Sequence, residues 1–505
     1  MKGRLRFLLD TNVVIPLQDP QQVLADSLAN FVRLAGAGGH QLLCHPANVR
    51  DFQRDPDVDR RKRNLHRLRQ FEQLEDSGSC PWNGVATSAN DACDNELLYA
   101  LQCDAVHALV TEDRRLYRKA QSRGLTARVY TIQTAEDWLR RLHEPRLVAL
   151  PNIQDVPLYT LTPELSSPFF DSLRAGYPAS SGKPGFDDWF RAKAREKRRA
   201  WVYRGDDGAL AALCIYQAQS NEVINDAGDV LSGAALKLCT FKVGELVRGR
   251  KIGELFLKAA FRYATDNQCL NIFITAKADS QDFLVQLLQD FGFEGRGAYG
   301  SDMVLVKCHP AAAPSIGSEA PVEFLIRYFP HFRADVAVKK WVVPILPGYH
   351  EILFPDYPKS QTQLFGPDGH VGNAIKLAYL CHARTKSIRP GDVVLFYRSA
   401  DEKAVTSVGV VERFEILQDA ASIAGLVRRR TVYSIKEIER LTSQPTKVIL
   451  FRLIGHVPRP VTYDQLLSAG VVTGPIQSIT QLSDDSFSSI CSRSGLPPST
   501  PVNQA

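Results

Sequence analysis

Short apolar runs alternate with helical patterns over the first 145 residues, and this alternation restricts the fold more than any other feature of the chain. The runs with the length and apolarity of buried strands are residues 5–9, 41–44 and 108–111. The helical patterns lie at residues 21–34, 60–74, 95–101 and 113–122. Strands that alternate with helices predict a parallel sheet flanked by helices. Ligands of such sheets bind beyond the carboxyl ends of the strands.

Acidic residues stand at the positions that this rule would use. Asp10 ends the first apolar run and Asp51 follows the second. Asp113 follows the third, and Asp94 opens the helix that leads into it. Taken singly, each acid is better explained as a helix cap or a solvated charge. The set, with no lysine or histidine base among them, favours a site for hard divalent cations. Two such cations about 4 Å apart activate water and stabilise the leaving oxygen in phosphodiester cleavage.

Three motifs of this segment carry a family resemblance. They are residues 8–15 (LLDTNVVI), 94–101 (DNELLYAL) and 109–113 (LVTED). In this order and at this spacing they resemble a PIN-domain nuclease over residues 5 to 140. The resemblance implies a Mg²⁺- or Mn²⁺-dependent ribonuclease in which Asp10, Asp94 and Asp113 are catalytic.

The same resemblance implies a fourth acid after the second strand, where family members usually place a glutamate. This chain has HPANVRD at residues 45–51, and we assign the catalytic role to Asp51. Glu96 and Glu112 are the alternatives. The metal ligands expected on this basis are Asp10, Asp94, Asp113 and Glu96.

A basic cluster lies within the helical pattern at residues 60–74. We predict that Arg61, Lys62 and Arg63 hold an RNA backbone through contacts to phosphate. A solvated helix face explains the cluster about equally well.

A glycine-containing turn stands between a strand pattern and a helix in the middle of the chain. The strand patterns are residues 210–216 and 235–243, and the helix begins near Ile252. Free backbone N–H groups at a helix N-terminus present a positive dipole end to phosphate. The turn is therefore a candidate pyrophosphate cradle, although a turn and a helix start explain its glycines equally well.

The elements that follow the turn strengthen this interpretation. A strand at residues 272–275, a helix at 282–290 and a strand at 303–307 complete an order that resembles GNAT acetyltransferases over residues 195 to 308. The resemblance implies that acetyl-CoA binds through its pyrophosphate to Val247, Arg248, Gly249, Arg250, Lys251, Ile252 and Gly253.

Two positions depart from the GNAT pattern. Lys251 stands where a glycine is usual, and Leu288 stands where the family often has a tyrosine general acid. Tyr299 and Glu222 are substitutes for acid and base without supporting spacing. A silent acetyl-CoA sensor and a scaffold for the nuclease are alternative interpretations.

The last segment, residues 322–490, is rich in short apolar stretches separated by turns. The clearest strands, at residues 393–397, 405–411 and 447–453, predict a small mixed β-barrel. Residues 372–376 (GNAIK), 388–399 (IRPGDVVLFYRS) and 408–412 (VGVVE) resemble the ASCH and EVE branch of PUA-like domains. The resemblance implies an RNA-binding pocket, for which Lys376, Arg398, Trp341, Tyr349, Tyr397, Gln477 and Ser478 are candidates. Aromatic faces beside cations suit single-stranded RNA, but each aromatic is more often a core residue.

Linker-like stretches at residues 146–151 and 309–318 divide the 505 residues into three expected domains. They are a PIN-like α/β domain at 1–145, a GNAT-like mixed-sheet domain at 150–310 and a PUA-like barrel at 320–492. Ten cysteines without a Cys-x-x-Cys pair indicate reduced thiols. No apolar run approaches the roughly 20 residues of a membrane span, and the first ten residues lack a signal sequence. We expect a cytoplasmic protein without membrane contact.

The leading functional hypothesis is a metal-dependent endoribonuclease with an acetyl-CoA-binding domain and an RNA-binding domain. PIN and GNAT domains both recur as toxins, so the resemblances imply RNA, including tRNA, as substrate and an antitoxin protein as partner. One alternative is an N-acetyltransferase for tRNA-borne or protein amines with a binding-only PIN domain. Another is an RNA-binding regulator without enzymatic activity.

Overall fold

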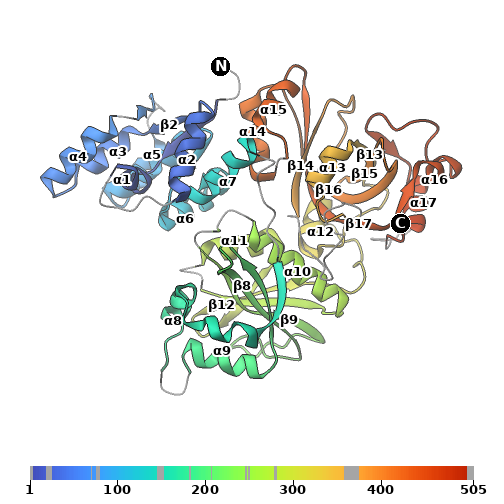
Figure 1. Cartoon of the computed structure of the whole chain (residues 1–505), viewed down its shortest axis with the longest axis horizontal. Coiled ribbons are helices and arrows are strands. Elements are labelled where there is room, and N and C mark those ends of the chain that lie inside the picture. Colours follow the sequence, from blue (N-terminus) through green and yellow to red (C-terminus); the bar gives the residue numbers. More distant parts are fainter. Residues whose placement is uncertain are drawn as a thin grey trace. The chain divides into compact units, whose positions relative to one another are not determined.

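The first sheet is five-stranded and entirely parallel, in the order β3-β2-β1-β4-β5. Figure 1 shows β2 of this sheet in blue, together with the helices of the same part of the chain. Its strands are β1 (Arg6–Leu9), β2 (Gln41–Cys44), β3 (Glu72–Gln73), β4 (Ala108–Val110) and β5 (Val129–Tyr130). β1 is central and pairs with both β2 and β4. Because helices cover both faces of the sheet, its residues Phe7, Leu8 and Leu9 are fully buried. The prediction of a parallel sheet flanked by helices is confirmed.

A computed structural model describes residues 4–18, 26–69, 71–75, 80–144, 153–180, 184–205, 207–244, 247, 251–277, 281–357, 375–430 and 432–496. The chain forms two compact units. The first comprises Met1–Ala149, Arg248–Arg250 and Leu417–Thr446, and the second comprises Leu150–Val247, Lys251–Ile416 and Lys447–Ala505. The linker expected at residues 309–318 therefore lies inside the second unit, and the three expected domain boundaries stay predictions.

The helices that accompany the parallel sheet follow its strands along the chain. They are α1 (Thr11–Gln18), α2 (Asp26–Ala37), α3 (Pro46–Gln53), α4 (Val58–Leu68), α5 (Ala89–Gln102), α6 (Arg114–Ser122) and α7 (Ile132–His143). Successive side chains of β1 point to opposite faces: Phe7 contacts Phe31 of α2 and Trp138 of α7. Leu8 packs in a core cluster with residues of α5 and α6.

Two predicted helices of this unit have different bounds in the structure. The pattern at residues 60–74 ends at Leu68, because Glu72–Gln73 continues as the edge strand β3 beside β2. The pattern at residues 95–101 begins earlier, at Ala89, where the Ser88 side chain accepts the Asp91 N–H as the N-cap. Asp94 therefore lies inside α5 and does not open it.

The first unit also holds a segment from far along the chain. Leu417–Thr446 leaves the third sheet and contributes α14 (Ala420–Val427), a short 3₁₀ turn at Arg428–Arg430 and α15 (Ile435–Leu441). Gly425 of α14 approaches the ring of His107, and α7 contacts the 3₁₀ turn. The stretch expected to form one domain at 320–492 is thus interrupted by a segment that packs in the first unit.

A pair of histidines, His40 and His143, lies near the start of β1 and predicts that the stability of the fold depends on pH. The His40 Nδ1 accepts the Leu5 N–H at 3.1 Å, so a neutral His40 carries its proton on Nε2, which lies 2.8 Å from the His143 Nε2. Burial, with the neighbouring His143, His107 and Arg4, lowers the pKa of His40 to about 3. The unfolded chain therefore binds more protons below pH 6.5, and stability is lost as the pH falls toward the folded pKa.

Because of His40, we expect the unfolding free energy to fall by about 2 kcal/mol when the pH is lowered from 7 to 5. His40→Gln should remove that part of the pH dependence in urea unfolding, whereas His66→Gln on the exposed face of α4 should retain it. Equal pH dependence in wild type and His40→Gln would show that His40 is not responsible.

The second unit begins with a seven-stranded mixed sheet in the order β11-β12-β10-β9-β8-β7-β6. Its strands are β6 (Ile153–Pro157), β7 (Arg199–Arg204), β8 (Leu210–Ser220), β9 (Ala234–Val243), β10 (Asn271–Ala276), β11 (Glu294–Tyr299) and β12 (Asp302–Cys308). β9 and β10 are parallel, and the other neighbours are antiparallel. This mixed sheet is consistent with a GNAT-like fold.

The helices of this part are α8 (Asp171–Gly176), α9 (Phe186–Arg195), α10 (Ile252–Asp266) and α11 (Asp282–Asp290). The apolar residues Ile252, Leu255, Phe256 and Ala260 recur in the sequence of α10 at helical spacing, and all four are buried in the core of the unit. The same core continues without interruption into the third sheet.

The third sheet is six-stranded and mixed, in the order β14-β17-β16-β15-β13-β18. Its strands are β13 (Lys340–Ile345), β14 (Lys376–Cys381), β15 (Val393–Arg398), β16 (Ala404–Leu417), β17 (Thr446–Thr462) and β18 (Thr480–Leu482). The accompanying helices are α12 (Pro321–Tyr328), α13 (Pro347–Leu353), α16 (Tyr463–Ser468) and α17 (Asp484–Ser494). The mixed sheet is as expected, while the strand pairings of the described residues run from β14 to β18 without closing, so the barrel stays a prediction.

Gly292, in the turn between α11 and β11, allows α12 to approach the seven-stranded sheet. Its φ is +80°, and a Cβ atom there would overlap the carbonyl oxygen of Ile326. We therefore expect Gly292→Ala to lower the unfolding free energy by about 2 to 4 kcal/mol through strain and displacement of α12. Chemical denaturation should show nearly no change for Gly295→Ala, whose Cβ would meet no atom within 4 Å. A silent Gly292→Ala would mean that α12 is not packed as described.

No helix among the described residues is long and apolar enough to cross a membrane.

Candidate functional site

Asp10 lies at the carboxyl end of β1, where the backbone N–H of Asp10 donates to the carbonyl of Val110 on β4. Its carboxylate is only 8% exposed. The Thr111 hydroxyl donates to one carboxylate oxygen at 2.6 Å, and the Thr11 N–H donates to the other at 2.7 Å. Both oxygens are thus oriented by donors from the two strand ends.

Thr111 links the residues that follow β1 and β4. Its hydroxyl oxygen accepts the backbone N–H of Asp113 at 2.9 Å and the side-chain amide of Asn12 at 3.3 Å. The side-chain oxygen Oδ1 of Asn12 in turn accepts the backbone N–H of Glu112 at 3.2 Å. Asn12 and Thr111 were not candidates in the sequence, although both belong to the motifs LLDTN and LVTED.

Asp113 begins α6, and one of its carboxylate oxygens accepts the Arg115 N–H at 2.7 Å as the helix N-cap. The helix-cap explanation is therefore correct for that oxygen. It does not exclude a role for the carboxylate, because a capping carboxylate keeps further acceptor positions.

Three aspartates from three elements act on one another electrostatically at this edge. Burial raises the pKa of Asp10 to about 6 against the hydrogen bonds from Thr111 and Thr11, and the charges of Asp113 and Asp51 raise it further. Burial also raises the pKa of Asp94 to about 7, opposed by Lys119 and aided by Asp10 and Asp113. Negative charge is therefore gathered here without full compensation, which is an environment that a cation would relieve.

The remaining candidate acids are engaged elsewhere. Asp51 forms an ion pair with Arg54 at 2.7 Å, although its charge still reaches Asp10. Glu96 contacts Arg50, accepts from Asn83 at 3.1 Å and lies 3.7 Å from the His45 ring. These partners of Glu96 lie on or next to α3 and on the 3₁₀ turn Pro81–Val85.

Glu112 accepts the Ile132 N–H at 2.8 Å, at the start of α7. In the part of the chain that the structure describes, no three His, Cys, Asp or Glu side chains are arranged so that together they hold a metal ion. Asp10, Asp94 and Asp113 are thus close enough for their charges to interact, but they are not in the positions of three ligands of one ion.

The predicted basic cluster lies on α4. Arg61 donates to the backbone carbonyl of Asp55 at 3.1 Å, whereas Lys62 and Arg63 are exposed. The two exposed side chains are accessible to a polyanion.

The predicted phosphate cradle is only partly described. Arg248, Gly249 and Arg250 lie outside the described residues, and Val247 and Ile252 are buried. Lys251 has a left-handed backbone with φ of 59°, and its Nζ lies 3.1 Å from the carbonyl oxygen of Lys376. A Cβ on Gly253 would lie 2.8 Å from the Leu287 side chain, so bulk is not tolerated at this position.

β9 and β10 part at their carboxyl ends. Their parallel register ends at Ile274 opposite Leu238, although β9 continues to Val243 alongside β8. α10 begins in the connection between these two strands. The strands thus diverge in the part of the sheet whose connection contains the N-terminus of α10, an end that presents free backbone N–H groups.

The acid and base candidates of this sheet do not converge. Leu288 is fully buried in the core, Tyr299 is exposed, and Glu222 forms an ion pair with Lys237. The described residues thus supply no general acid at the position where the resemblance expects one.

Most RNA-binding candidates of the last segment have structural partners. Arg398 is buried, and its guanidinium contacts Asp401 at 2.9 Å and Glu351 at 2.8 Å. Lys376 donates its backbone N–H to Glu254 at 2.6 Å and its ammonium to Asp290 at 2.9 Å. Trp341 and Tyr397 are buried, and the Trp341 Nε1 donates to Asp392 at 2.9 Å. Tyr349 is half-buried, whereas Gln477 and Ser478 are exposed.

Comparisons with known proteins find weak similarity to solved structures over part of the chain. No family model matches the chain, and no curated protein matches it. An ASCH protein from Zymomonas mobilis is 17% identical over 30% of this chain and 94% of its own, with a TM-score of 0.24. A "histone acetyltransferase HPA2 and related acetyltransferase" from Corynebacterium glutamicum is 16% identical over 33% of this chain and 99% of its own, with a TM-score of 0.25.

A GNAT-family acetyltransferase from Streptococcus pneumoniae is 15% identical over 31% of this chain and 97% of its own, with a TM-score of 0.23. Parts of this chain are thus weakly similar to ASCH domains and to GNAT acetyltransferases. TM-scores this low do not establish a shared function.

Proposed function

We propose that this protein is a metal-dependent endoribonuclease of the PIN type and that its first unit cleaves RNA. The observation that supports the proposal is the gathering of Asp10, Asp94 and Asp113 at the carboxyl ends of the strands of a parallel sheet, where the charge of Asp113 raises the pKa of Asp10, and the charges of Asp10 and Asp113 raise the pKa of Asp94. A purely structural set of acids would be expected to pair with cations, as Asp51 and Glu96 do.

The donor chemistry of this edge fits Mg²⁺ or Mn²⁺. Carboxylate oxygens are the ligands that these hard cations take, and Mg²⁺ is usually bound by one or two carboxylates together with water and substrate phosphate. A preformed group of three ligands is therefore not required. Asp10, Asp94 and Asp113 would hold the metal, which when bound supplies an activated water and stabilises the leaving oxygen of the phosphodiester.

The chain's own residues have separate tasks in this proposal. Thr111 and the Thr11 N–H orient the Asp10 carboxylate, and Asn12 orients Thr111. Lys62 and Arg63 on α4 contact the phosphate backbone of RNA. Backbone contacts of this kind position the strand without reading its sequence.

Cleavage of total RNA by the full chain tests the proposal. Incubation with Mg²⁺ or Mn²⁺ should produce new RNA ends that are absent with EDTA, and sequencing of these ends identifies the target. RNA that is bound but uncut in every metal condition would contradict the nuclease and favour a binding function.

A second activity is favoured by the divergence of β9 and β10. We infer that acetyl-CoA binds between these strands with its pyrophosphate at the N-terminus of α10. Leu288 is a core residue and has no group that can act as a general acid. The inference therefore concerns acetyl-CoA binding primarily and acetyl transfer only secondarily. Acetyl-CoA should bind the full chain in isothermal titration, and the absence of any binding would contradict this inference. The ASCH-like RNA pocket and the antitoxin partner stay predictions.

A further inference from the structure

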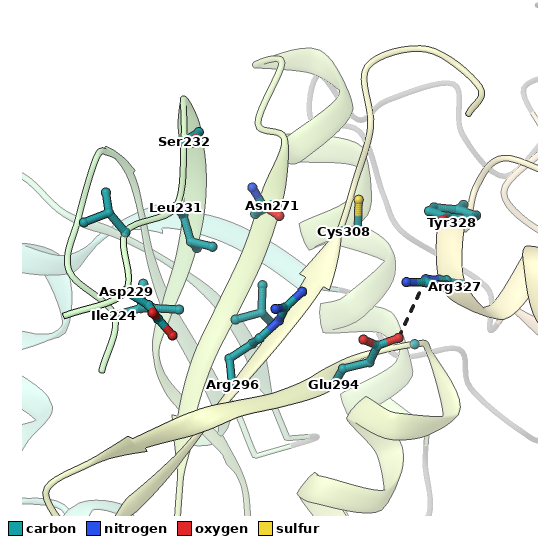
Figure 2. Close-up of a pocket in the computed structure, with 13 residues that line it drawn as sticks. Ile224, Asp229, Leu231, Ser232, Asn271, Glu294, Arg296, Cys308, Arg327 and Tyr328 are labelled. Carbon is teal, nitrogen blue, oxygen red and sulfur yellow. Dashed lines mark ion pairs between the residues drawn. The ribbon is translucent and has the colours of Figure 1, made fainter. Parts of the chain in front are cut away.

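A hollow of about 500 Å³ lies at one edge of the seven-stranded sheet, away from the place where β9 and β10 part (Figure 2). Asn271, the first residue of β10, lines it opposite Cys308, the last residue of β12. β9 and β10 part only beyond Ile274, toward the other end of β10. The hollow is therefore separate from the proposed acetyl-CoA groove, and its volume is within the roughly 300 to 1,000 Å³ of small-molecule sites.

The floor of the hollow is apolar. Ile224 and Val306 are buried in a small cluster with Phe273, and Leu231 packs against that cluster. This cluster lies on the face of the sheet opposite the main core, because neighbouring residues of β10 and β12 alternate between the two faces. A flat apolar group of a ligand would be sheltered there.

Two guanidinium groups at the rim have donors to spare. Arg296 on β11 is exposed, and its side chain has no partner among the described residues. Arg327 on α12 lies 3.8 Å from Glu294 and 3.5 Å from Glu319, which is longer than a good hydrogen bond. Figure 2 shows Arg296 between Asp229 on one side and the pair of Glu294 and Arg327 on the other.

An amide, an aromatic ring and two carboxylates complete the rim. Asn271 has a side-chain amide without a partner among the described residues, and Tyr328 presents an aromatic ring beside Arg327. Glu294 and Asp229 offer acceptors for hydroxyl or amino groups. The hollow thus combines an apolar floor, an aromatic face, an amide, two cations and two carboxylates.

We propose that this hollow binds a nucleoside monophosphate. The base would lie on the floor beside Tyr328 with Asn271 at its polar edge, and Arg296 and Arg327 would take the phosphate. An inorganic anion would leave the floor and the amide unused, and an apolar ligand would desolvate both guanidinium groups without pairing them. The ligand would bridge β11 and α12 and so hold this helix on the sheet.

Equilibrium binding to the full chain tests the proposal, with AMP, GMP, CMP and UMP as probes and adenosine and inorganic phosphate as comparisons. At least one monophosphate should bind more tightly than both comparisons. The double variant R296Q/R327Q should weaken it by about tenfold or more, since charged hydrogen bonds to phosphate are lost. Arg262→Gln, which alters an exposed arginine of α10, should leave the affinity unchanged. Inorganic phosphate binding as tightly as the nucleotides, or affinity unchanged in R296Q/R327Q, would overturn the proposal.

Cys308 supplies a readout on the wild-type chain that does not depend on the folding of variants. Its thiol is exposed on the wall of the hollow, and Cys103 in the first unit is an exposed reference thiol. The bound monophosphate should slow alkylation of Cys308 and leave that of Cys103 unchanged, as measured by peptide mass spectrometry. Nucleotide that binds without protecting Cys308 would be bound elsewhere, including the acetyl-CoA groove, and would likewise overturn the assignment.

Discussion

Asp10→Asn should lower the rate of metal-dependent RNA cleavage at least about 100-fold. The reason is that several kcal/mol of transition-state stabilisation depend on the ion that this carboxylate helps to hold. The substitution keeps the size of the side chain and an acceptor for the Thr111 hydroxyl, so the carboxyl ends of β1 and β4 should stay joined. Asp94→Asn and Asp113→Asn should cause losses of the same order. Cleavage is measured as the rate of appearance of new RNA ends.

Asp104→Asn is the matched control for these variants. Asp104 is an exposed aspartate of the first unit that pairs with Arg128, and its charge does not act on Asp10 or Asp94. Addition of Mg²⁺ or Mn²⁺ should raise the melting temperature of wild type and of this control, but not of Asp10→Asn. Full cleavage by Asp10→Asn and Asp113→Asn alike would remove the nuclease proposal.

Arg452→Ala should lower the unfolding free energy of the second unit by about 3 to 5 kcal/mol, the usual cost of breaking a buried ion pair. The guanidinium is almost fully buried, donates to Glu412 at 2.6 Å and to the carbonyl oxygen of Asp290 at 2.9 Å, and lies over the Phe291 ring. Without this side chain, Glu412 would lose the cation with which it pairs. The carbonyl oxygen of Asp290, the last residue of α11, would lose a hydrogen-bond donor. Urea unfolding monitored by tryptophan fluorescence measures the change.

The neighbouring Arg413 offers a matched control, because it pairs with Glu415 on the exposed side of β16. Arg413→Ala should change stability by less than about 1 kcal/mol. The double variant R452M/E412L should recover much of the lost stability, since an apolar pair of similar volume leaves no buried charge. A loss for Arg452→Ala no greater than that for Arg413→Ala would show that the buried pair does not stabilise the unit.

The strands of the first sheet were readable in the sequence because a central parallel strand is buried on both faces and appears as a continuous apolar run. Residues 5–9, 41–44 and 108–111 correspond to β1, β2 and β4 within one residue at each end. The edge strands β3 and β5 were missed, since two residues at the margin of a sheet carry no periodic pattern. The same limit explains the helix predicted to run through Glu72.

The candidate site was only partly predictable. Asp10 and Asp113 were found because strand ends are visible locally, but Thr111 and Asn12 were not. Their role comes from the pairing of β1 with β4, about a hundred residues apart in the chain. The contact of Glu96 with Arg50 has the same origin, because it depends on how α3 packs against α5.

Local pattern in the sequence was sufficient for the parallel sheet, the amphipathic face of α10 and the acids at two strand ends, because each depends on neighbours within a few residues. Only the tertiary structure decided which charges are paired. Lys376 and Arg398 became partners of Asp290, Asp401 and Glu351. The Arg296 side chain has no partner within the part of the chain that the structure describes, and it lies beside an unforeseen hollow. It also decided that residues 417–446 belong to the first unit. Burial and pairing are properties of residues distant in the chain, and a one-dimensional pattern contains no information about which of them meet.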